Sequence, residues 1–326
     1  MKAIIQDRYG PGPKDVLRLQ EKEQPAVGDE EVLVRVHAAS VDRGTWHAMA
    51  GLPYPIRLAG FGVRRPKHAN PGRSLAGTVE AAGSRVTGFK PGDEVFGIGT
   101  ASFAEYAAAR PAKLAPKPAN LSFEQAATVP VSGLTALQAV RDHGQVQVGQ
   151  NVLVIGASGG VGSFAVQIAK AFGATVTGMC GTAKTDMVRA LGADRVIDYT
   201  THDLDGSGDR YDVILDTGGN RPLPQLRRAL TSKGTLVIVG GETAGRLLGG
   251  SGRQLRAQIL SPMTSQKLGT FIASENAEDL QTLRGLIEAG AVTPAVDRIY
   301  PLAEVSAAIS CLLDGHARGK IAITMR

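Results

Sequence analysis

A cluster of glycines near the middle of the chain has the spacing of a phosphate-binding turn. Within seven residues the sequence GASGGVG carries Gly156, Gly159, Gly160 and Gly162. Glycine permits tight backbone turns, and it lets a phosphate oxygen approach main-chain N–H groups closely. A helix N-terminus adds unpaired N–H groups and a positive dipole end, which attract a pyrophosphate. We therefore predict that these glycines, with Ser158 and Val161 between them, bind the phosphates of a dinucleotide.

The segments on either side of this turn have the pattern that such a site requires. Residues 152–155 are four consecutive apolar residues, typical of a strand buried on both faces. After the turn, apolar or small side chains recur at the three- and four-residue spacing of a helix, at Val161, Phe164, Ala165, Ile168, Ala169 and Phe172. Gly173 then ends the helix, and residues 174–179 read as the next strand. The alternative is a glycine-rich turn without a ligand, and the strand–turn–helix–strand context favours the dinucleotide.

The second strand indicates which dinucleotide is bound. NAD sites usually place Asp or Glu about 20 residues beyond the glycines, where it holds the ribose 2′-OH. Residues 177–184 contain no acid, and the first one, Asp186, is expected in the first turn of the next helix. The missing acid and the nearby Lys184 favour a 2′-phosphate, and hence NADP(H). Taken alone, Lys184 is equally compatible with an ordinary solvated lysine.

Composition excludes several classes of protein. The 326 residues suggest two domains of roughly 150 each, and the hydrophobic content of 43% is ordinary for a globular protein with a large core. The aromatic content of 5% argues against stacking platforms for nucleic acid. The net charge of +6 is spread along the chain, apart from a cluster at Arg64, Arg65 and Lys67. We expect this modest excess to attract an anionic cofactor rather than a nucleic acid.

The cysteines and the apolar runs indicate the cellular compartment. Cys180 and Cys311 are the only cysteines, which excludes a disulfide-rich scaffold and a four-cysteine zinc site. The N-terminal sequence lacks the long apolar core of a signal peptide. No run reaches the roughly 18 apolar residues of a membrane span. We therefore expect a cytoplasmic protein with no membrane partner.

The first part of the chain, to about residue 120, is predicted to be rich in strands. The candidate strands are residues 2–6, 31–38, 77–82, 94–97 and 103–108. The proline-rich residues 111–118 mark a change of composition that we interpret as a domain boundary.

From Ser122 onward the pattern alternates between helices and strands. Ser122 and Gln125 have the spacing of a helix capping box. Residues 133–140 are a candidate helix, and further buried strands are predicted at residues 195–197, 213–216 and 235–239. This alternation predicts a doubly wound parallel sheet. Residues 245–252 are rich in glycine and are expected to form a mobile loop, and residues 320–324 form an isolated last strand.

Short-chain dehydrogenases are one class with this glycine spacing. Their motif lies near the N-terminus, and they also carry Tyr-x-x-x-Lys. None of the six tyrosines here is followed four residues later by lysine. That class is therefore disfavoured.

The chain strongly resembles the medium-chain dehydrogenase/reductase superfamily, in its zinc-independent quinone oxidoreductase branch. The resemblance rests on motifs along the whole length, among them EVLVRVHAASVDRGTW at Glu31, AGTVEAAGSRVTGFKPGDEVFG at Ala76, GASGGVGSFAVQIAKAFGA at Gly156, YDVILDTGGN at Tyr211 and GKIAI at Gly319. It implies an α/β architecture in which a GroES-like, β-rich catalytic domain, residues 1–122 with 268–326, surrounds a Rossmann domain, residues 123–267. An inserted Rossmann domain explains why the glycine turn lies in the middle of the chain.

The resemblance also bears on zinc. Zinc alcohol dehydrogenases of this superfamily carry a cysteine near the positions of Val41 and Asp42 here, and a Gly-His-Glu where this chain has Gly72-Arg73-Ser74. No cysteine precedes Cys180. The remaining histidines of the first part, His37, His47 and His68, follow no ligand spacing. We predict no metal.

Cofactor contacts beyond the glycine turn are implied by the resemblance. Lys184 and Tyr199 match by spacing a pair that grips the adenosine 2′-phosphate in related NADPH quinone reductases, and Thr182 adds a hydroxyl. Asp216 to Asn220 is expected to face the cofactor ribose. The nicotinamide end is assigned to Thr135, Gly240, Gly241 and Phe271, the last in a carboxamide-binding strand over residues 271–273. Tyr199 is equally compatible with a half-buried ring at a strand end, and Thr135 with a helix residue that bonds its own backbone.

Without zinc there is no Lewis acid to polarise an alcohol or a carbonyl. Hydride transfer from NADPH to a quinone or an α,β-unsaturated carbonyl is then the easier reaction, for which the protein supplies position and dry surroundings. Our first choice of proton donor is Tyr54, whose phenol can bond a developing oxyanion, although an exposed loop aromatic is the alternative. Asp42 is expected to orient the ribose or the substrate, or else to cap a turn.

Two other functions stay open on the sequence. One is an NAD(P)-dependent alcohol dehydrogenase, disfavoured by the missing zinc ligands. The other is a non-catalytic NADPH- or RNA-binding protein, disfavoured for RNA by the low aromatic content. By analogy with relatives we expect a homodimer through an edge strand of the Rossmann sheet, for which residues 234–239 are the candidate. The physiological substrate is not fixed by the sequence.

Overall fold

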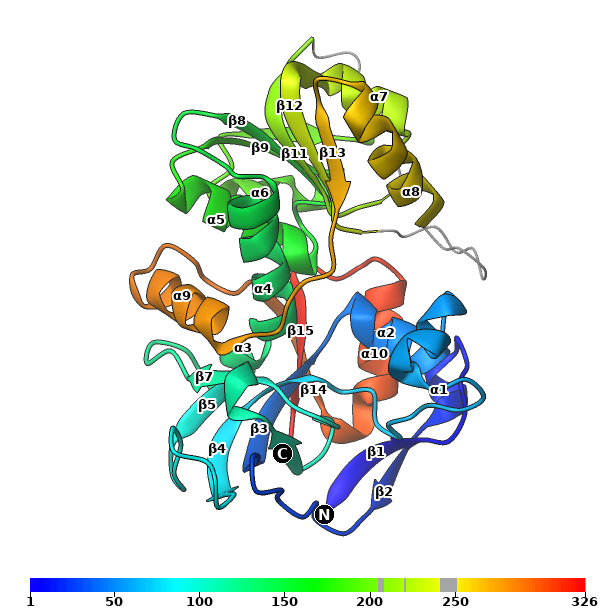
Figure 1. The fold of residues 1–326 in the computed structure, drawn as a ribbon, viewed down its shortest axis with the longest axis vertical. Coiled ribbons are helices and arrows are strands. Elements are labelled where there is room, and N and C mark those ends of the chain that lie inside the picture. The colour runs from blue at the N-terminus through cyan, green and yellow to red at the C-terminus, as the bar shows by residue number, and fades with distance from the viewer. Residues whose placement is uncertain (205–207, 220, 241–250, 326) are drawn as a thin grey trace. The chain divides into compact units, whose positions relative to one another are not determined.

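The computed structural model describes residues 1–204, 208–219, 221–240 and 251–325, which form two compact units (Figure 1). The first, called the terminal unit here, consists of Met1–Leu134, Glu275–Ala289 and Pro294–Arg326. The second, the central unit, consists of Thr135–Ser274 with Gly290–Thr293. Both chain ends thus contribute to one unit, and the boundary falls inside a helix rather than in the proline-rich residues 111–118.

The terminal unit is built on a seven-stranded sheet in the order β14-β15-β3-β4-β5-β7, with β6 paired to β3. Its strands are β3 (Val32–Val41), β4 (Ser74–Ala82), β5 (Glu94–Ile98), β6 (Tyr106–Ala109), β7 (Leu114–Pro116), β14 (Val296–Pro301) and β15 (Lys320–Thr324). A separate antiparallel pair is formed by β1 (Lys2–Gln6) and β2 (Leu17–Glu21). The predicted β-rich first part is confirmed. The last strand is not isolated, because β15 pairs with β14 on one side and β3 on the other.

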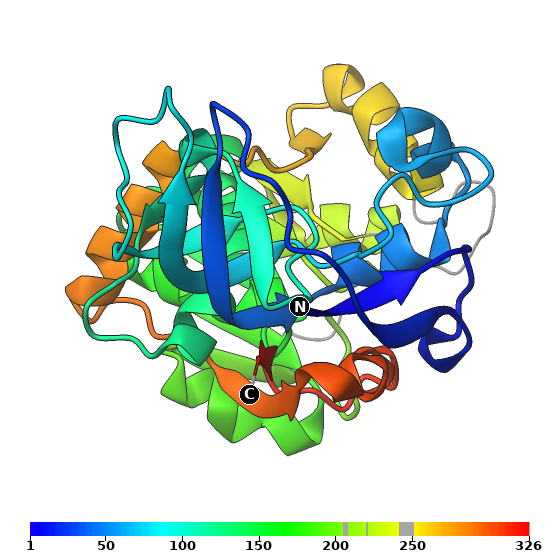
Figure 2. The ribbon, with the colours of Figure 1, turned by 90° about the horizontal axis from the view of Figure 1, so that it is seen from below.

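Short helices surround this sheet. They are α1 (Pro13–Val16), α2 (Arg43–Ala50), α3 (Phe123–Ala127), α9 (Ala277–Glu288) and α10 (Val305–Leu313), with a π-helical turn η1 (Arg57–Phe61). The first and last helices pack together, as Figure 2 shows, and the Ser306 hydroxyl donates to the Pro13 carbonyl across 293 residues of sequence. Their shared core includes Val16, Val305 and Ile309. The chain ends are therefore joined by apolar packing as well as by β15.

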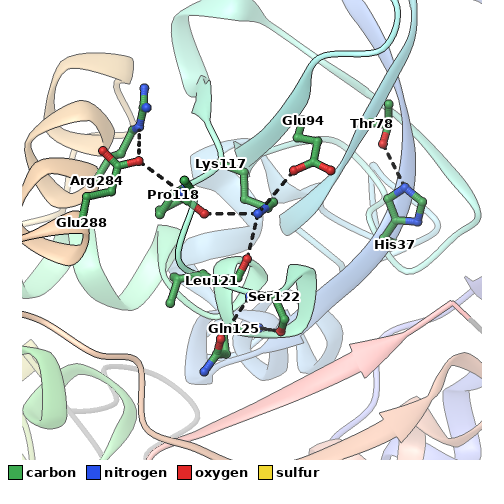
Figure 3. Close-up of polar contacts among 11 residues, drawn as sticks. His37, Thr78, Glu94, Lys117, Pro118, Leu121, Ser122, Gln125, Arg284 and Glu288 are labelled. Atoms are coloured by element: carbon green, nitrogen blue, oxygen red, sulfur yellow. Dashed lines mark hydrogen bonds and ion pairs between the residues drawn. The ribbon is translucent and has the colours of Figure 1, made fainter. Parts of the chain in front are cut away.

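The predicted capping box at the start of α3 is present (Figure 3). The Ser122 hydroxyl accepts from the Gln125 N–H at 3.2 Å, and the Gln125 side chain accepts from the Ser122 N–H at 3.0 Å. Beside it, the nearly buried Lys117 ammonium donates to the Leu121 carbonyl at 2.7 Å and lies 3.3 Å from the Glu94 carboxylate. These bonds fix the chain where it leaves the sheet and enters the helices.

The central unit contains a six-stranded sheet in the order β10-β9-β8-β11-β12-β13, in which every pair is parallel. Its strands are β8 (Asn151–Ile155), β9 (Thr175–Cys180), β10 (Arg195–Asp198), β11 (Tyr211–Asp216), β12 (Leu230–Ile238) and β13 (Lys267–Thr270). Its helices are α5 (Gly160–Ala171), α6 (Thr185–Ala190), α7 (Leu223–Ala229) and α8 (Ser251–Leu260), and α4 (Pro130–Gln138) enters it from the terminal unit. The predicted doubly wound parallel sheet is confirmed.

One expectation about this unit is wrong, and another lies mostly outside the described residues. Residues 234–239 belong to β12, which is paired on both sides, so they do not form an edge strand; within the described chain the edges are β10 and β13. Of the glycine-rich residues 245–252, the first six lie outside the described residues, and the last two begin α8.

Among the residues that the structure describes, no helix has the length and apolarity to cross a membrane.

Asp194 joins three elements of the central unit. Its carboxylate accepts from the Val176 N–H on β9 at 2.7 Å and from the Lys170 ammonium on α5 at 2.8 Å. Its own N–H donates to the Val176 carbonyl. Partial burial raises the pKa of Asp194, but the bonds from Lys170 and Val176 lower it by more, so the pKa lies below its ordinary value.

We predict that Asp194→Asn lowers the free energy of unfolding by about 1 kcal/mol near pH 7, a value discounted because the carboxylate is partly exposed. Since the pKa of Asp194 is lowered by folding, its contribution is present above the unfolded pKa of about 3.9 and is lost as the pH falls through the lower folded pKa. Urea unfolding of both proteins across acid pH measures the difference. Asp186→Asn, at a highly exposed carboxylate, is the control. If Asp194→Asn lowers the free energy of unfolding by no more than Asp186→Asn does, the stabilising role of the Asp194 carboxylate is contradicted.

Candidate functional site

The glycine turn connects the end of β8 to the start of α5. Gly156 has a φ of +78°, a conformation that side chains with a Cβ rarely adopt. A Cβ on Gly162 would lie 2.0 Å from the Gly156 carbonyl oxygen, so only glycine allows α5 to approach the turn this closely. The N–H groups of Gly156 and Ala157 both donate to the Met179 carbonyl on β9, at 3.1 and 3.0 Å. The turn is thus held rigidly against the sheet.

The N-terminus of α5 is left open by this arrangement. Gly159 is the N-cap residue, and it offers no side chain to bond the first-turn N–H groups. Gly159, Gly160 and Val161 are half-buried, and Ser158 is buried. Uncapped N–H groups at the positive end of a helix are suited to an anion. The predicted phosphate-binding residues therefore share one location.

A second group of predicted residues meets beside Gly181, just beyond the end of β9. The Tyr199 hydroxyl lies 3.1 Å from the position of a Cβ on Gly181, and the Lys184 N–H donates to the Gly181 carbonyl at 2.9 Å. Tyr199 is 56% exposed, so its ring is available to a ligand. The predicted acid of the next helix, Asp186, is paired with Arg189 at 2.8 Å. No carboxylate of β9 competes with a phosphate, because this strand ends at Cys180.

Thr182 has partners of its own. Its hydroxyl lies 2.7 Å from that of Thr200, which in turn donates to Asp198 at 2.7 Å. Bonds from Thr182 and Thr200 lower the pKa of Asp198, so that carboxylate is ionised at neutral pH. A ligand contact from Thr182 would have to share its hydroxyl with this chain of bonds.

Cys180 ends β9 beneath this loop. Burial and the neighbouring Asp198 raise its pKa to about 11, and the charges of Lys184 and Arg189 offset only part of that rise. The thiol is therefore protonated at neutral pH and is not a nucleophile.

The carboxyl ends of β11 and β12 hold an ion pair that sequence reasoning missed. The Asp216 carboxylate is fully buried; it accepts from the Gly219 N–H at 2.9 Å and lies 2.6 Å from the guanidinium of Arg253 on α8. Arg253 also donates to the carbonyls of Arg221 and Gly240, at 2.8 and 3.4 Å. The sequence offers one indication of this ion pair: Asp216 ends the apolar run VILD, and a buried carboxylate needs a partner.

The residues predicted near the ribose and the nicotinamide of the cofactor lie in several elements. A Cβ on Gly240 would lie 2.6 Å from the Thr217 carbonyl, so this strand end is closely packed. Phe271 follows β13 rather than lying in a strand, because pairing stops at Thr270, and its ring stacks on His143 with 4.1 Å between centroids. Thr135 is half-buried on α4. Asn220 and Gly241 lie outside the described residues.

The two predicted catalytic residues lie in the terminal unit. Asp42 is the N-cap of α2, where its carboxylate accepts from the Thr45 N–H at 2.9 Å. Near it, the buried Lys320 ammonium donates to the Val41 carbonyl at 3.2 Å and the Ser132 hydroxyl at 3.0 Å. Burial lowers the pKa of Lys320, and the charge of Asp42 opposes that change. Asp42 thus serves the helix cap that was its alternative interpretation.

Tyr54 is 40% exposed and packs on an arginine. The Arg57 guanidinium lies 4.8 Å from the ring centroid of Tyr54 and 4.3 Å from that of Tyr9, and it donates to the Gly51 carbonyl at 2.8 Å. A cation over the ring favours this orientation of Tyr54. Within the described chain, the structure gives the Tyr54 hydroxyl no hydrogen-bond partner.

Arg73, aligned with a zinc-ligand segment of relatives, and two of the remaining histidines carry other contacts. Arg73 is ion-paired with Glu275. His37 lies 3.0 Å from the Thr78 hydroxyl, as Figure 3 shows, and His47 lies 2.7 Å from the Leu52 carbonyl. Over the residues described, no three His, Cys, Asp or Glu side chains are grouped as a metal site would require.

Comparisons with known proteins agree on one family. Residues 28–119 match the alcohol dehydrogenase GroES-like domain, and residues 191–323 match the family described as zinc-binding dehydrogenase. The NADPH-dependent alkenal/one oxidoreductase of Arabidopsis thaliana chloroplasts is 32% identical, over 99% of this chain and 79% of that protein.

Two solved structures share the fold. The quinone oxidoreductase of Coxiella burnetii has a TM-score of 0.87 and 30% identity, over 100% of this chain and 99% of that one. The Escherichia coli quinone oxidoreductase complexed with NADPH has a TM-score of 0.83 and 26% identity, over 99% and 100%.

We predict that Lys184→Ala lowers the affinity for NADPH by about tenfold and leaves the affinity for NADH nearly unchanged, because a lysine–phosphate contact contributes about 1–2 kcal/mol. Calorimetric titration with each nucleotide measures both affinities. Lys233→Ala, at an exposed lysine of the same unit, is the control. Equal losses for NADPH and NADH would contradict a 2′-phosphate contact.

Proposed function

The chain belongs to the medium-chain dehydrogenase/reductase superfamily, in its quinone-oxidoreductase-like branch, and on that premise we propose that it is an NADPH-dependent oxidoreductase that reduces quinones or α,β-unsaturated carbonyls without a metal. The uncapped N-terminus of α5 behind the glycine turn is the observation that carries this proposal. The functions for which its relatives are named, quinone oxidoreductase and NADPH-dependent alkenal/one oxidoreductase, support the acceptor classes.

The residues of the central unit fit NADP(H). The open first turn of α5 suits a pyrophosphate, and a side chain at position 162 would push this turn away from the Gly156 carbonyl. Lys184 and Tyr199, both at Gly181, suit the 2′-phosphate. The uncharged end of β9 removes the carboxylate by which NAD sites hold the ribose. When bound, the cofactor supplies the hydride.

The terminal unit supplies the groups for the acceptor. We assign proton donation to the Tyr54 hydroxyl, which Arg57 orients, with solvent as the competing source. Asp42 acts as a positioning residue through the cap of α2. Arg73 stands where zinc-dependent relatives carry a ligand segment, and it is ion-paired with Glu275. This supports chemistry without a metal.

We further propose a homodimer in a reducing compartment such as the cytoplasm. One side of β13 is unpaired within the described chain, which leaves a sheet edge for a second copy. Cys180 and Cys311 are both free thiols, as a reducing compartment permits.

The proposal predicts that purified, chelator-treated protein oxidises NADPH with a quinone such as menadione, or with a neutral enone such as pent-3-en-2-one. NADPH is expected to be preferred over NADH by about tenfold or more in kcat/KM. Absorbance at the nicotinamide band measures turnover.

Activity that appears only after zinc is added would contradict the metal-free mechanism and favour an alcohol dehydrogenase. Tight NADPH binding without turnover would favour a binding role. In the same assay, Tyr54→Phe separates proton sources, because a kcat unchanged with the enone would exclude this phenol as donor.

A further inference from the structure

A cavity of about 500 Å³ is lined by residues of the terminal unit alone. Part of its wall is apolar, contributed by Ala48, Phe61, Pro66 and Ile98. It also borders Gly72 and Arg73, the segment aligned with the zinc-ligand position of relatives. A cavity of this size accommodates a small organic molecule.

The polar part of the wall is mainly cationic. Arg73, Arg110 and Lys113 line the cavity, against a single lining carboxylate, Glu31. Arg110 is exposed, and within the described chain it has no ion pair. An arginine fork without a partner beside an apolar wall is suited to bind a carboxylate or a phosphate in a bidentate manner.

The bonds around Arg73 leave the cluster positively charged. Glu275 pairs with both Arg73 and Lys113, the latter at 2.8 Å, so one carboxylate serves two cations. Glu275 is only 17% exposed, whereas Arg73 and Lys113 are each 40% exposed. After this pairing, the Arg73–Lys113–Glu275 triad still has a net charge of +1.

A second set of cations extends the field along the cavity rim. Pro66 lines the cavity, and Arg64, Arg65 and Lys67 on either side of it are exposed. The structure gives none of these three an ion pair among the residues it describes. Like charges this close together repel one another, and an anionic ligand relieves that repulsion.

We propose that this cavity binds an acceptor that carries an anionic group, a carboxylate in the simplest case, with Arg110 as its principal partner and the apolar wall against its carbon skeleton. The inference rests on the proposed function, whose acceptor class it narrows. In the reaction, NADPH gives a hydride to the β carbon and becomes NADP⁺, and a proton from solvent or Tyr54 reaches the α carbon. The C=C bond is reduced, and the anionic group is unchanged.

The experiment compares two enones with the same carbon skeleton, anionic 4-oxopent-2-enoate and neutral pent-3-en-2-one, and the change of their ratio in the variants is the decisive readout. We expect wild-type kcat/KM to be about tenfold higher for the anionic enone at low salt, and Arg110→Gln to reduce this ratio at least about fivefold. The preference is also expected to weaken between about 0.02 and 0.3 M salt, since the charges are near the surface. Arg35→Gln, at an exposed arginine that does not line the cavity, is the control.

A binding measurement makes the test independent of turnover. The saturated analogues 4-oxopentanoate and pentan-2-one are titrated into wild type, Arg110→Gln and the double variant Arg64→Gln/Arg65→Gln. Tighter binding of 4-oxopentanoate, weakened by Arg110→Gln but not by Arg35→Gln, supports the anionic site. Equal binding of the two analogues, or equal effects of Arg110→Gln and Arg35→Gln, would overturn it. Failure of the proposed function is distinct, because it appears as absent reduction of both enones while 4-oxopentanoate still binds.

Discussion

The close approach of α5 to the end of β8 is the constraint on which the central unit depends. The Gly156 carbonyl stands where a side chain at position 162 would begin, and Gly156 itself needs a left-handed backbone. The two residues together let the helix start directly above the strand. Because Gly159 provides no cap, the first-turn N–H groups remain open, and the same geometry that closes the turn leaves donors suited to an anion. The parallel neighbours of β8 then bring their own carboxyl ends to this edge of the sheet.

Charge placement distinguishes the two ends of that edge. β9 itself ends without a carboxylate, and Lys184 stands in the following turn, which favours a cofactor with an additional phosphate. Beside β11 a buried carboxylate, Asp216, is neutralised by Arg253 from α8. Removing either partner of such a pair would leave a buried charge uncompensated, at a cost of about 3–5 kcal/mol. The ion pair thus anchors α8 to the strand ends, and the adjacent glycine Gly240 fits closely against Thr217.

Features coded by neighbouring residues could be predicted from the sequence, and features made by distant residues could not. The capping box of Ser122 and Gln125 and the alternating strands and helices depend on local spacing, and both are present. The pairing of β15 between β14 and β3, the interior place of β12, and the partner of Asp216 each depend on contacts between residues far apart in sequence. The catalytic residues were the least predictable, because a lone aspartate such as Asp42 caps a helix as readily as it serves a reaction.

The proposed function depends first on whether the glycine turn and the start of α5 bind the phosphates of the cofactor. Calorimetric titration of NADPH into Gly162→Ala tests it most directly, with Gly285→Ala as the control, since a Cβ on Gly285 meets no atom within 4 Å. Circular dichroism establishes that both variants are folded. We expect Gly162→Ala to lose NADPH affinity by at least about tenfold, because the added Cβ must push α5 away from the turn, while Gly285→Ala binds as the wild type does. A folded Gly162→Ala that binds NADPH as tightly as the wild type would contradict it.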